Sequence, residues 1–262
     1  MTMEKDTEKL PIIRITEQER SEIDDAVASE FLLTIIFNNK ELVTLLCSPS
    51  NPKELALGFL ASEGLIKSRE EVKRITLDDR MGIVRVETEK GDGAPEDLLF
   101  KRLITSGCGR GVSFYNASDA KSLTKVESSI TIAASEIFSL MKEFQHRSEI
   151  FRTTGGVHSA ALCDAKSILF FSEDIGRHNA LDKIFGECLL KDIPIDDYII
   201  VSSGRISSEM LFKVVKRKVP IVISRSAPTA SGVRLAVDLG ITLIGFVRGK
   251  RMNVYANDWR VM

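Results

Sequence analysis

The sequence lacks several features that would place it in a common class of protein. No apolar run approaches the roughly 20 residues of a membrane-spanning helix, and the first residues are charged, with no apolar signal core. We therefore expect a cytoplasmic protein with no membrane contact. An excess of one charge is also absent, because 36 Lys and Arg residues stand against 37 Asp and Glu residues, for a formal net charge of −1. This balance excludes a broadly basic nucleic-acid binder.

Cysteine is scarce, and no two cysteines form a C-x-x-C motif, so local spacing supports neither a zinc ribbon nor a thioredoxin-type site. Cys47, Cys163 and Cys188 each adjoin leucine, and we interpret them as small buried hydrophobic residues. Cys108 differs, because glycines flank it in the segment 106–111 (SGCGRG). Its thiol is expected to be accessible, and Arg110 and backbone N–H groups can stabilise a thiolate. Cys108 is the candidate nucleophile. The alternative is that it is an exposed cysteine in a turn, with no catalytic function.

Common catalytic motifs are missing as well. The chain has no Walker loop, no G-x-G-x-x-G and no H-E-x-x-H. The stretch 203–205 (SGR) lacks the G-x-S-x-G of a nucleophile elbow. His and Cys do not cluster in sequence, so we expect no metal held by protein side chains.

The chain divides into two regions of different patterning. The first predicts short strands, at 11–15, 31–38, 42–48, 72–77 and 82–89. One helix is expected from Pro52, with Asn51 as its N-cap and Gly64 at its end. We take residues 1–130 as a smaller, strand-rich α+β N-terminal region ending in the Cys108 loop.

Residues 131–262 predict a larger α/β domain. A helix is expected around 137–144, and a pair of strands at 159–164 and 167–172. Strands at 198–203, 220–225 and 241–247 then alternate with helices near 181–188, 207–218 and 231–240. Such alternation indicates a mostly parallel sheet, and the apolar, β-branched strands suit a sheet that is covered on both faces.

Arginines recur just after four predicted strands. Ligands of open α/β sheets bind beyond the carboxyl ends of the strands, and the residues in question are Arg177, Arg205, Arg225 and Arg248. Arginine binds phosphate and carboxylate groups in two-point geometry. Four such loops predict an anionic ligand, a nucleotide or a phosphorylated cofactor. The alternative is that the arginines cap helices or pair with Glu173, Asp174 and Asp182.

Three histidines are present. His158 is a candidate acid–base group or a partner of a backbone carbonyl. His178 is either an imidazole oriented by Asp174 or a cap for the helix that follows. His146 lies on the polar side of a helix and is expected to be solvated.

Several of these segments together resemble one family. They are residues 51–60 (NPKELALGFL), 154–158 (TGGVH), 173–183 (EDIGRHNALDK), 203–205 (SGR) and 226–229 (SAPT). The chain is similar, from about residue 12 to its end, to the FdhD/NarQ family of sulfur carriers that formate dehydrogenase requires.

The resemblance implies a sulfurtransferase. Such proteins accept persulfide sulfur from a cysteine desulfurase and pass it to the molybdenum cofactor, bis-molybdopterin guanine dinucleotide, before this cofactor enters formate dehydrogenase. The acceptor maps to Cys108. The cofactor-binding segment maps to Phe246, Val247, Arg248, Gly249, Lys250 and Arg251, and we add Arg177, His178, Arg205 and Arg225 from the loops. A three-layer, cytidine-deaminase-like fold for the larger domain and a homodimer are also implied.

Two departures from related patterns bear on mechanism. Family members usually carry C-x-x-C in the loop, but Gly111 replaces the second cysteine here. The zinc motif of deaminases requires H-x-E and P-C-x-x-C, and residues 158–160 (HSA) lack the glutamate. The fold is therefore expected without zinc chemistry. Two other functions remain open: a chaperone that delivers the cofactor without transferring sulfur, and a nucleotide hydrolase that uses His158 or His178.

Overall fold

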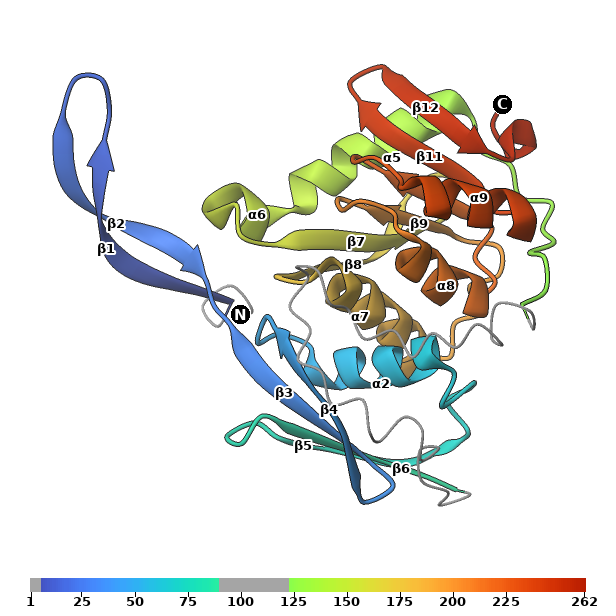
Figure 1. Cartoon of the computed structure of the whole chain (residues 1–262), viewed down its shortest axis with the longest axis horizontal. Helices are drawn as coiled ribbons and strands as arrows, with labels where there is room; N and C mark the ends of the chain where they lie inside the picture. Colours follow the sequence, from blue (N-terminus) through green and yellow to red (C-terminus); the bar gives the residue numbers. More distant parts are fainter. Residues whose placement is uncertain (1–5, 90–122) are drawn as a thin grey trace.

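The structure is a computed structural model, which describes residues 6–89 and 123–262 (Figure 1). Cys108, Arg110 and Gly111 lie outside the described residues. The described strands form a two-stranded arm, a four-stranded sheet and a six-stranded sheet. Within these ranges no helix has both the length and the apolarity needed to cross a membrane.

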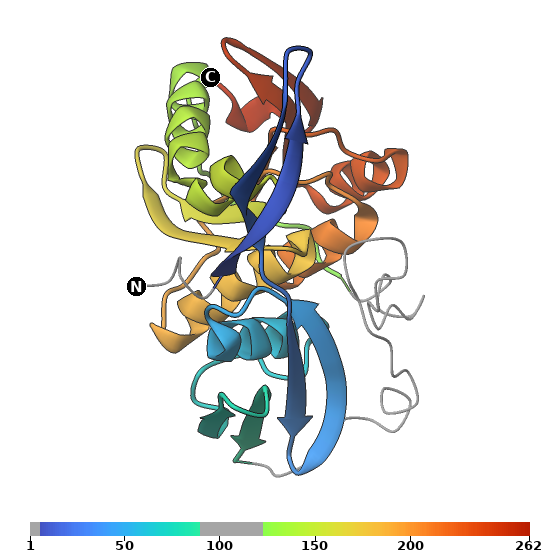
Figure 2. The same cartoon turned by 90° about the vertical axis from the view of Figure 1, so that its left-hand side faces the viewer.

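The arm consists of β1 (Thr7–Ile15) and β2 (Arg20–Ala28), which pair antiparallel over their whole length. It stands away from the rest of the molecule in Figure 1, and in Figure 2 it lies in front of the body, pointing toward the viewer. The sequence pattern predicted a strand within β1 but not β2, because acidic residues at Glu22, Asp24 and Asp25 dilute the β-branched signal there.

The four-stranded sheet has the order β4-β3-β6-β5. Its strands are β3 (Phe31–Phe37), β4 (Lys40–Cys47), β5 (Val72–Asp78) and β6 (Ile83–Thr88). Asn38 and Asn39 both have positive φ, 45° and 64°, the conformation that a tight hairpin between β3 and β4 needs. Helix α2 (Pro52–Glu63) begins with proline and ends at Gly64, as predicted. Asn51 is left-handed, however, and its side chain makes no capping hydrogen bond.

Helix α2 packs against α7 (Arg177–Leu190) at a very short distance. A Cβ atom at Gly58 would lie 1.7 Å from the carbonyl oxygen of Asp182, and one at Gly186 would lie 1.8 Å from that of Glu54. Glycine is therefore required on both helices, because any side chain would collide with the opposite backbone.

The six-stranded sheet has the order β12-β11-β10-β9-β7-β8. Its strands are β7 (His158–Cys163), β8 (Ile168–Asp174), β9 (Ile199–Ser202), β10 (Ile221–Ser224), β11 (Thr242–Arg248) and β12 (Arg251–Ala256). The helices are α5 (Ala134–Arg147), α6 (Glu149–Thr154), α8 (Ser208–Lys216) and α9 (Ala230–Leu239), with a 3₁₀ turn at Asp258–Arg260. Helix α6 and strand β12 were not predicted from the sequence pattern.

Helices cover both faces of this sheet. One apolar core joins the sheet to α7, α8 and α9, and another joins its opposite face to α5. The expected three layers are therefore present, whereas the specific likeness to cytidine deaminases stays a prediction. The division of the chain at residue 130 also stays a prediction.

The expectation of a mostly parallel sheet is wrong. Strands β9, β10 and β11 are parallel, but β7 runs antiparallel to β8 and to β9, and β12 runs antiparallel to β11. The reason is local. Short turns join β7 to β8 and β11 to β12, whereas helices return the chain between the parallel strands.

Candidate functional site

The strand directions bring four loops to one edge of the large sheet. Because β8 and β9 are both antiparallel to β7, the carboxyl ends of β8, β9, β10 and β11 lie on the same side. This edge carries Arg177, Arg205, Arg225 and Arg248, as well as His158 at the start of β7. From β8 to β11 the sheet spans four strand spacings, or about 19 Å. The arginines thus form a row longer than a lone phosphate group.

Arg177, Arg205 and His158 form the best-defined part of this edge. A Cβ atom at Gly204 would lie 3.0 Å from Cβ and Cδ of Arg177, so glycine lets the loop after β9 pass over the arginine. The pKa of His158 is lowered, mainly by burial and then by the charges of Arg177 and Arg205. Its Nδ1 lies 3.4 Å from the Ser203 hydroxyl, which accepts a hydrogen bond from the Ser159 N–H.

His178 takes neither of its two expected roles. Helix α7 starts at Arg177 with Gly176 as its N-cap, so His178 lies inside the first turn. Its Nε2 lies 3.5 Å from a carboxylate oxygen of Glu209, not beside Asp174. Burial, reinforced by Lys213 and Arg177, lowers the pKa of His178 to about 3. The imidazole is therefore neutral, and its contact with Glu209 is not an ion pair.

The three carboxylates that could have neutralised the arginines are bonded elsewhere. Asp174 pairs with Lys183 at 2.7 Å, and Asp182 pairs with Lys213 at 2.8 Å. Glu173 accepts hydrogen bonds from the backbone N–H groups of residues 150 and 151, at the start of α6. Most charges of the 173–183 segment thus serve the packing of the protein. The positive charges of Arg205 and Arg225 at the sheet edge are therefore not neutralised by these three carboxylates.

Among the described residues, the guanidinium groups of Arg205 and Arg225 make no hydrogen bond or ion pair, and both side chains are exposed. The backbone around them is well fixed. The backbone N–H of Arg225 donates to the carbonyl of Ser202, and the Ser224 hydroxyl donates to the carbonyl of Gly204. The loops therefore hold the two unpaired guanidinium groups on a backbone that is fixed by hydrogen bonds. Such preorganised positive charge favours the binding of an anion.

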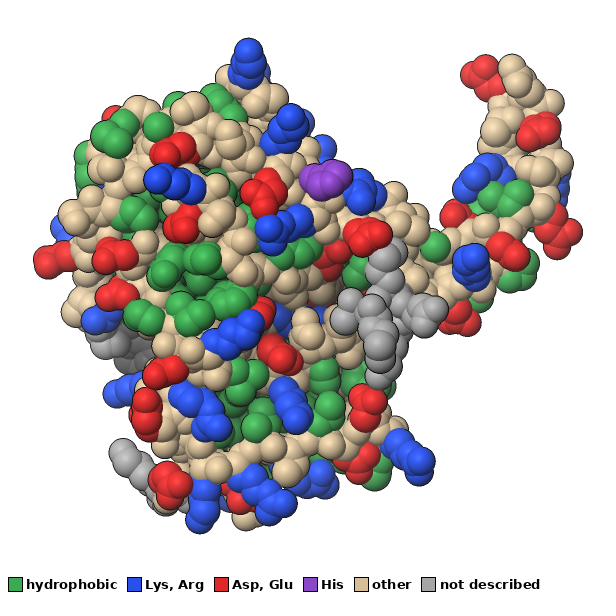
Figure 3. Space-filling view, turned by 180° about the vertical axis from the view of Figure 1, so that it is seen from behind, with side chains coloured by type: hydrophobic (Ala, Val, Ile, Leu, Met, Phe, Trp, Pro, Cys, Tyr) green, Lys and Arg blue, Asp and Glu red, His purple; other side chains and the backbone are tan. Residues whose placement is uncertain are grey.

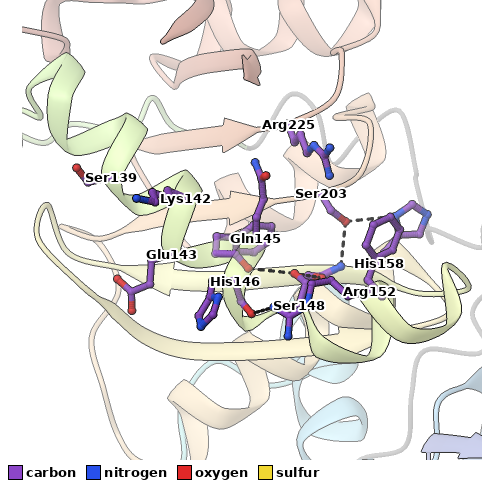
Figure 4. Close-up of a pocket in the computed structure, with 13 residues that line it drawn as sticks. Ser139, Lys142, Glu143, Gln145, His146, Ser148, Arg152, His158, Ser203 and Arg225 are labelled. Atoms are coloured by element: carbon purple, nitrogen blue, oxygen red, sulfur yellow. Dashed lines mark hydrogen bonds between the residues drawn. The ribbon is translucent and has the colours of Figure 1, made fainter. Parts of the chain in front are cut away.

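A cavity of about 770 Å³ opens beside this edge (Figure 4). Its inner end holds His158, Ser203 and Arg225 at the sheet, and its outer end runs along α5 and α6 (Figure 4). The residues that line it are Ser139, Lys142, Glu143, Phe144, Gln145, His146, Ser148, Phe151, Arg152, His158, Ser159, Ser203 and Arg225. We call it the α5–α6 cleft. His146 is exposed, as expected, but it also borders this cleft.

The segment 246–251 is the tip of a hairpin that extends from the same edge. Phe246 has a positive φ of 52° at a bulge, and its N–H donates to the carbonyl of Ser226, next to Arg225. The Arg248 guanidinium lies over the Phe246 ring, 5.5 Å from its centre. Gly249, Lys250 and Arg251 are exposed. Whether these residues bind a cofactor stays a prediction.

The three described cysteines are confirmed as buried: Cys47, Cys163 and Cys188 are each 0% exposed. Burial raises the pKa of Cys47 and of Cys188 to about 12 and also raises the pKa of Cys163. Such thiols are poor nucleophiles near neutral pH. Elimination leaves Cys108 as the candidate, although it lies outside the described residues.

Part of this site was not foreseen from the sequence. Lys142, Gln145 and Arg152 belong to α5 and α6, far from the glycine-rich and arginine-bearing loops, and they give no motif. Only the fold of α5 and α6 over the sheet brings them beside Ser203 and Arg225. In the described parts of the chain, no group of three or more His, Cys, Asp or Glu side chains is arranged to hold a metal ion.

The fold and this edge define an α/β protein with a row of arginines at the carboxyl ends of its central strands. Comparison with known proteins is more specific. The model of the FdhD/NarQ family matches residues 28–262, and the chain belongs to this family.

Its relatives include two proteins named sulfur carrier protein FdhD. The protein from Bacillus pumilus is 48% identical over 237 residues, which is 90% of each chain. The protein from Bacillus subtilis is 46% identical over 248 residues, or 95% of each chain. A crystal structure of a putative formate dehydrogenase accessory protein from Desulfotalea psychrophila is also similar, with a TM-score of 0.80 and 26% identity. The match covers 98% of this chain and 99% of that one.

Proposed function

We propose that this protein is a sulfur carrier that supports the maturation of formate dehydrogenase. Cys108 accepts sulfur from a cysteine desulfurase, and the sulfur passes to the molybdenum cofactor, bis-molybdopterin guanine dinucleotide, before the cofactor enters its enzyme. The protein acts as a sulfurtransferase, and the cofactor is its cargo. The names of the relatives support the class of function.

The observation that carries the choice of Cys108 is the burial of the other three thiols. In the first step the Cys108 thiolate attacks the outer sulfur of the desulfurase persulfide. The S–S bond of the donor breaks, the donor cysteine leaves as a thiolate, and Cys108 becomes a persulfide. This step needs an accessible thiolate, which Cys47, Cys163 and Cys188 do not provide.

The cationic edge supports the identity of the cargo. A guanine dinucleotide cofactor carries diphosphate groups at separated positions, and the arginines after β8, β9, β10 and β11 are spread over about 19 Å. We assign the phosphates to Arg177, Arg205, Arg225 and the 246–251 segment. His178 lies next to Arg177 in the chain, and its ring is 19% exposed with a lowered pKa, so we assign it to the cofactor site as a neutral hydrogen-bonding group and not as a cation.

Sulfur loading tests the first half of the proposal. The protein is incubated with a cysteine desulfurase and free cysteine, and its intact mass is measured. A gain of one sulfur atom is expected, located on Cys108 by peptide mapping. Cys108→Ala should not gain sulfur, whereas the control Cys188→Ala should. Sulfur found on Cys163 or Cys188 would overturn the assignment.

Nucleotide binding tests the second half. We expect the triple variant Arg248→Ala, Lys250→Ala, Arg251→Ala to bind guanine nucleotide more weakly in calorimetry, because each charged hydrogen bond contributes about 1.5–3 kcal/mol. Sulfur loading of Cys108 should persist. An unchanged affinity would place the site elsewhere. If Cys108→Ala still activates formate dehydrogenase in cells that lack the native carrier, the chaperone function is favoured instead.

A further inference from the structure

A second cavity, of about 470 Å³, lies between the C-terminal ends of α2 and α8. Residues between 61 and 67 form one wall, residues 215–218 form the other, and residues 123 and 124 also border it. It shares no lining residue with the α5–α6 cleft. We call this cavity the α2–α8 groove.

The α2–α8 groove concentrates positive charge. Its basic lining residues are Lys67, Lys216, Arg217 and Lys218. Its one acidic lining residue is Glu63, whose side chain is only 3% exposed and contacts the buried Lys213 at 3.3 Å. Elsewhere the charges are mixed, and Figure 3 shows basic and acidic side chains interspersed over the face of the body seen there. The net charge of the whole chain, −1, therefore hides a local basic site.

Two of the four cations hold the walls of the groove together. The Lys216 ammonium group donates to the carbonyl of Glu63 at 3.3 Å, and the Arg217 guanidinium donates to the carbonyl of Lys67 at 3.2 Å. Basic side chains near a helix C-terminus often bond to backbone carbonyls in this way. Lys67 and Lys218 differ, because both are exposed and their ammonium groups bond to no other described residue. These two charges are available to a ligand.

Lys218 also has an unfavourable backbone conformation. Its φ is 57°, in the left-handed region. Its N–H donates to the carbonyl of Val215, and the Val219 N–H donates to that of Val214, which closes the end of α8. Glycine is the usual residue at such a position, because a side chain there is strained. Residues held in strained conformations cluster at ligand sites, and here the strain places an unpaired cation on the rim.

The floor of the groove is apolar. Ala61, Ile66 and Val215 are buried there, and Leu123 is partly buried and packs against the core of the large sheet. An apolar centre with a charged rim is the usual anatomy of a protein–protein interface. A free phosphate ion would use only the rim. An acidic peptide segment with one apolar side chain would use both the rim and the floor.

The groove adjoins the part of the chain that carries the candidate nucleophile. Leu123 and Thr124, which line it, directly follow the segment 90–122, and this segment contains Cys108. A protein bound in the groove is therefore held beside the point where this segment rejoins the described structure.

We propose that the α2–α8 groove docks the protein that donates sulfur to Cys108, through an acidic segment of that donor with an apolar anchor. This inference rests on the sulfur-carrier function proposed above. The carboxylates of the donor pair with Lys67 and Lys218, and its apolar side chain packs on Ile66 and Leu123. The groove thus selects the donor protein, whereas the arginine edge is assigned to the cofactor.

The kinetics of sulfur loading by a cysteine desulfurase test the docking. The groove variant Lys67→Glu, Lys218→Glu reverses the two unpaired charges and keeps the bonds of Lys216 and Arg217. At low salt its KM should rise about tenfold, with kcat changed less than about twofold, because rim charges act mainly on association. Added salt should weaken loading of the natural protein and narrow the difference between the two.

Two controls separate docking from folding. The variant Lys40→Glu, Lys166→Glu makes the same change of charge at two exposed lysines outside the groove, at the start of β4 and in the turn between β7 and β8. It should load like the natural protein. Cysteine persulfide is a small donor that needs no docking surface. It should transfer sulfur to Cys108 of all three proteins at the same rate.

An unchanged KM in the groove variant, or an equal rise in the lysine control, would overturn the docking. A groove variant slowed equally with both donors would do the same, because the defect would then lie at Cys108. Inorganic phosphate that inhibits loading more than chloride at equal ionic strength would identify a site for a free anion instead. A natural protein that accepts no sulfur from the desulfurase would overturn the sulfur-carrier function, and the docking with it.

Discussion

The ammonium group of Lys183 lies 2.7 Å from a carboxylate oxygen of Asp174, and neither side chain is more than 1% exposed. Asp174 also accepts hydrogen bonds from the backbone N–H groups of Ser48 and Gly176 and from the Asn179 amide. Lys183 donates further to the carbonyl of Ser48. This pair thus joins the end of β4, in the small sheet, to the turn that presents Arg177.

Replacing Lys183 with methionine should lower the free energy of unfolding by about 3–5 kcal/mol, because it leaves the Asp174 charge buried without its partner. Chemical denaturation measures this change. The control is Arg147→Ala, which removes an exposed pair with Glu143 and should cost about 1 kcal/mol or less. Equal losses for the two variants would contradict a central role for the buried pair.

Gly58→Ala should be strongly destabilising, beyond the 1–3 kcal/mol or so that overpacking commonly costs. The added methyl group would lie 1.7 Å from a backbone oxygen of α7, and backbone cannot move aside as a side chain can. Gly64→Ala is the matched control. It has φ of 82° but open space around it, and should cost only about 1–2 kcal/mol. Thermal melts would compare the two, and a mild effect at Gly58 would argue against the close helix contact.

Thiol labelling should modify one cysteine per folded chain. Burial raises the pKa values of the three described thiols, so at neutral pH they should react with iodoacetamide only after denaturation. Mass spectrometry counts the labels before and after unfolding. In Cys108→Ala the folded protein should remain unlabelled. Rapid labelling of Cys47 in the folded chain would contradict its burial.

Stability should fall as the pH decreases from about 7 to 5, partly because of His178. Its pKa is about 3 in the folded protein and near 6.5 when unfolded, so the unfolded state binds a proton that the folded state does not. At pH 5 this difference costs about 2 kcal/mol relative to pH 7. His178→Gln should flatten the pH dependence of the unfolding free energy between these values. An identical slope in the variant would show that other groups cause it.

Gly111→Cys should shorten the life of a Cys108 persulfide. The added thiolate can attack Cys108, expel hydrosulfide and close a disulfide, whereas glycine offers no such route. Mass spectrometry over time after loading would compare the two proteins, with Gly111→Ser as a control of similar size and no thiol. If the natural chain never holds a persulfide while Gly111→Cys does, the chaperone function would replace sulfur transfer.

Strands and helices in the large sheet were predictable because their patterns are local. Apolar, β-branched runs alternate with helical periods, so β9, α8, β10, α9 and β11 all appear near the expected residues. The direction in which each strand runs was harder to predict from the sequence. Whether β7 joins the sheet antiparallel depends on hydrogen bonds between residues about 40 positions apart, such as Ala160 and Ser202, and no local pattern encodes that choice.

The sequence by itself determined the family, the buried character of three cysteines and the arginine after each of four strands, since these depend on residue type and short-range order. The tertiary structure decided which charges remain available. Asp174 and Asp182 bond to buried lysines, so they do not neutralise Arg205 and Arg225 at the sheet edge. It also decided that α5 and α6 close a cleft beside Ser203, and that β1 and β2 stand away from the body. The physical reason is that long-range packing, not residue type, determines which charged groups face each other and which face water.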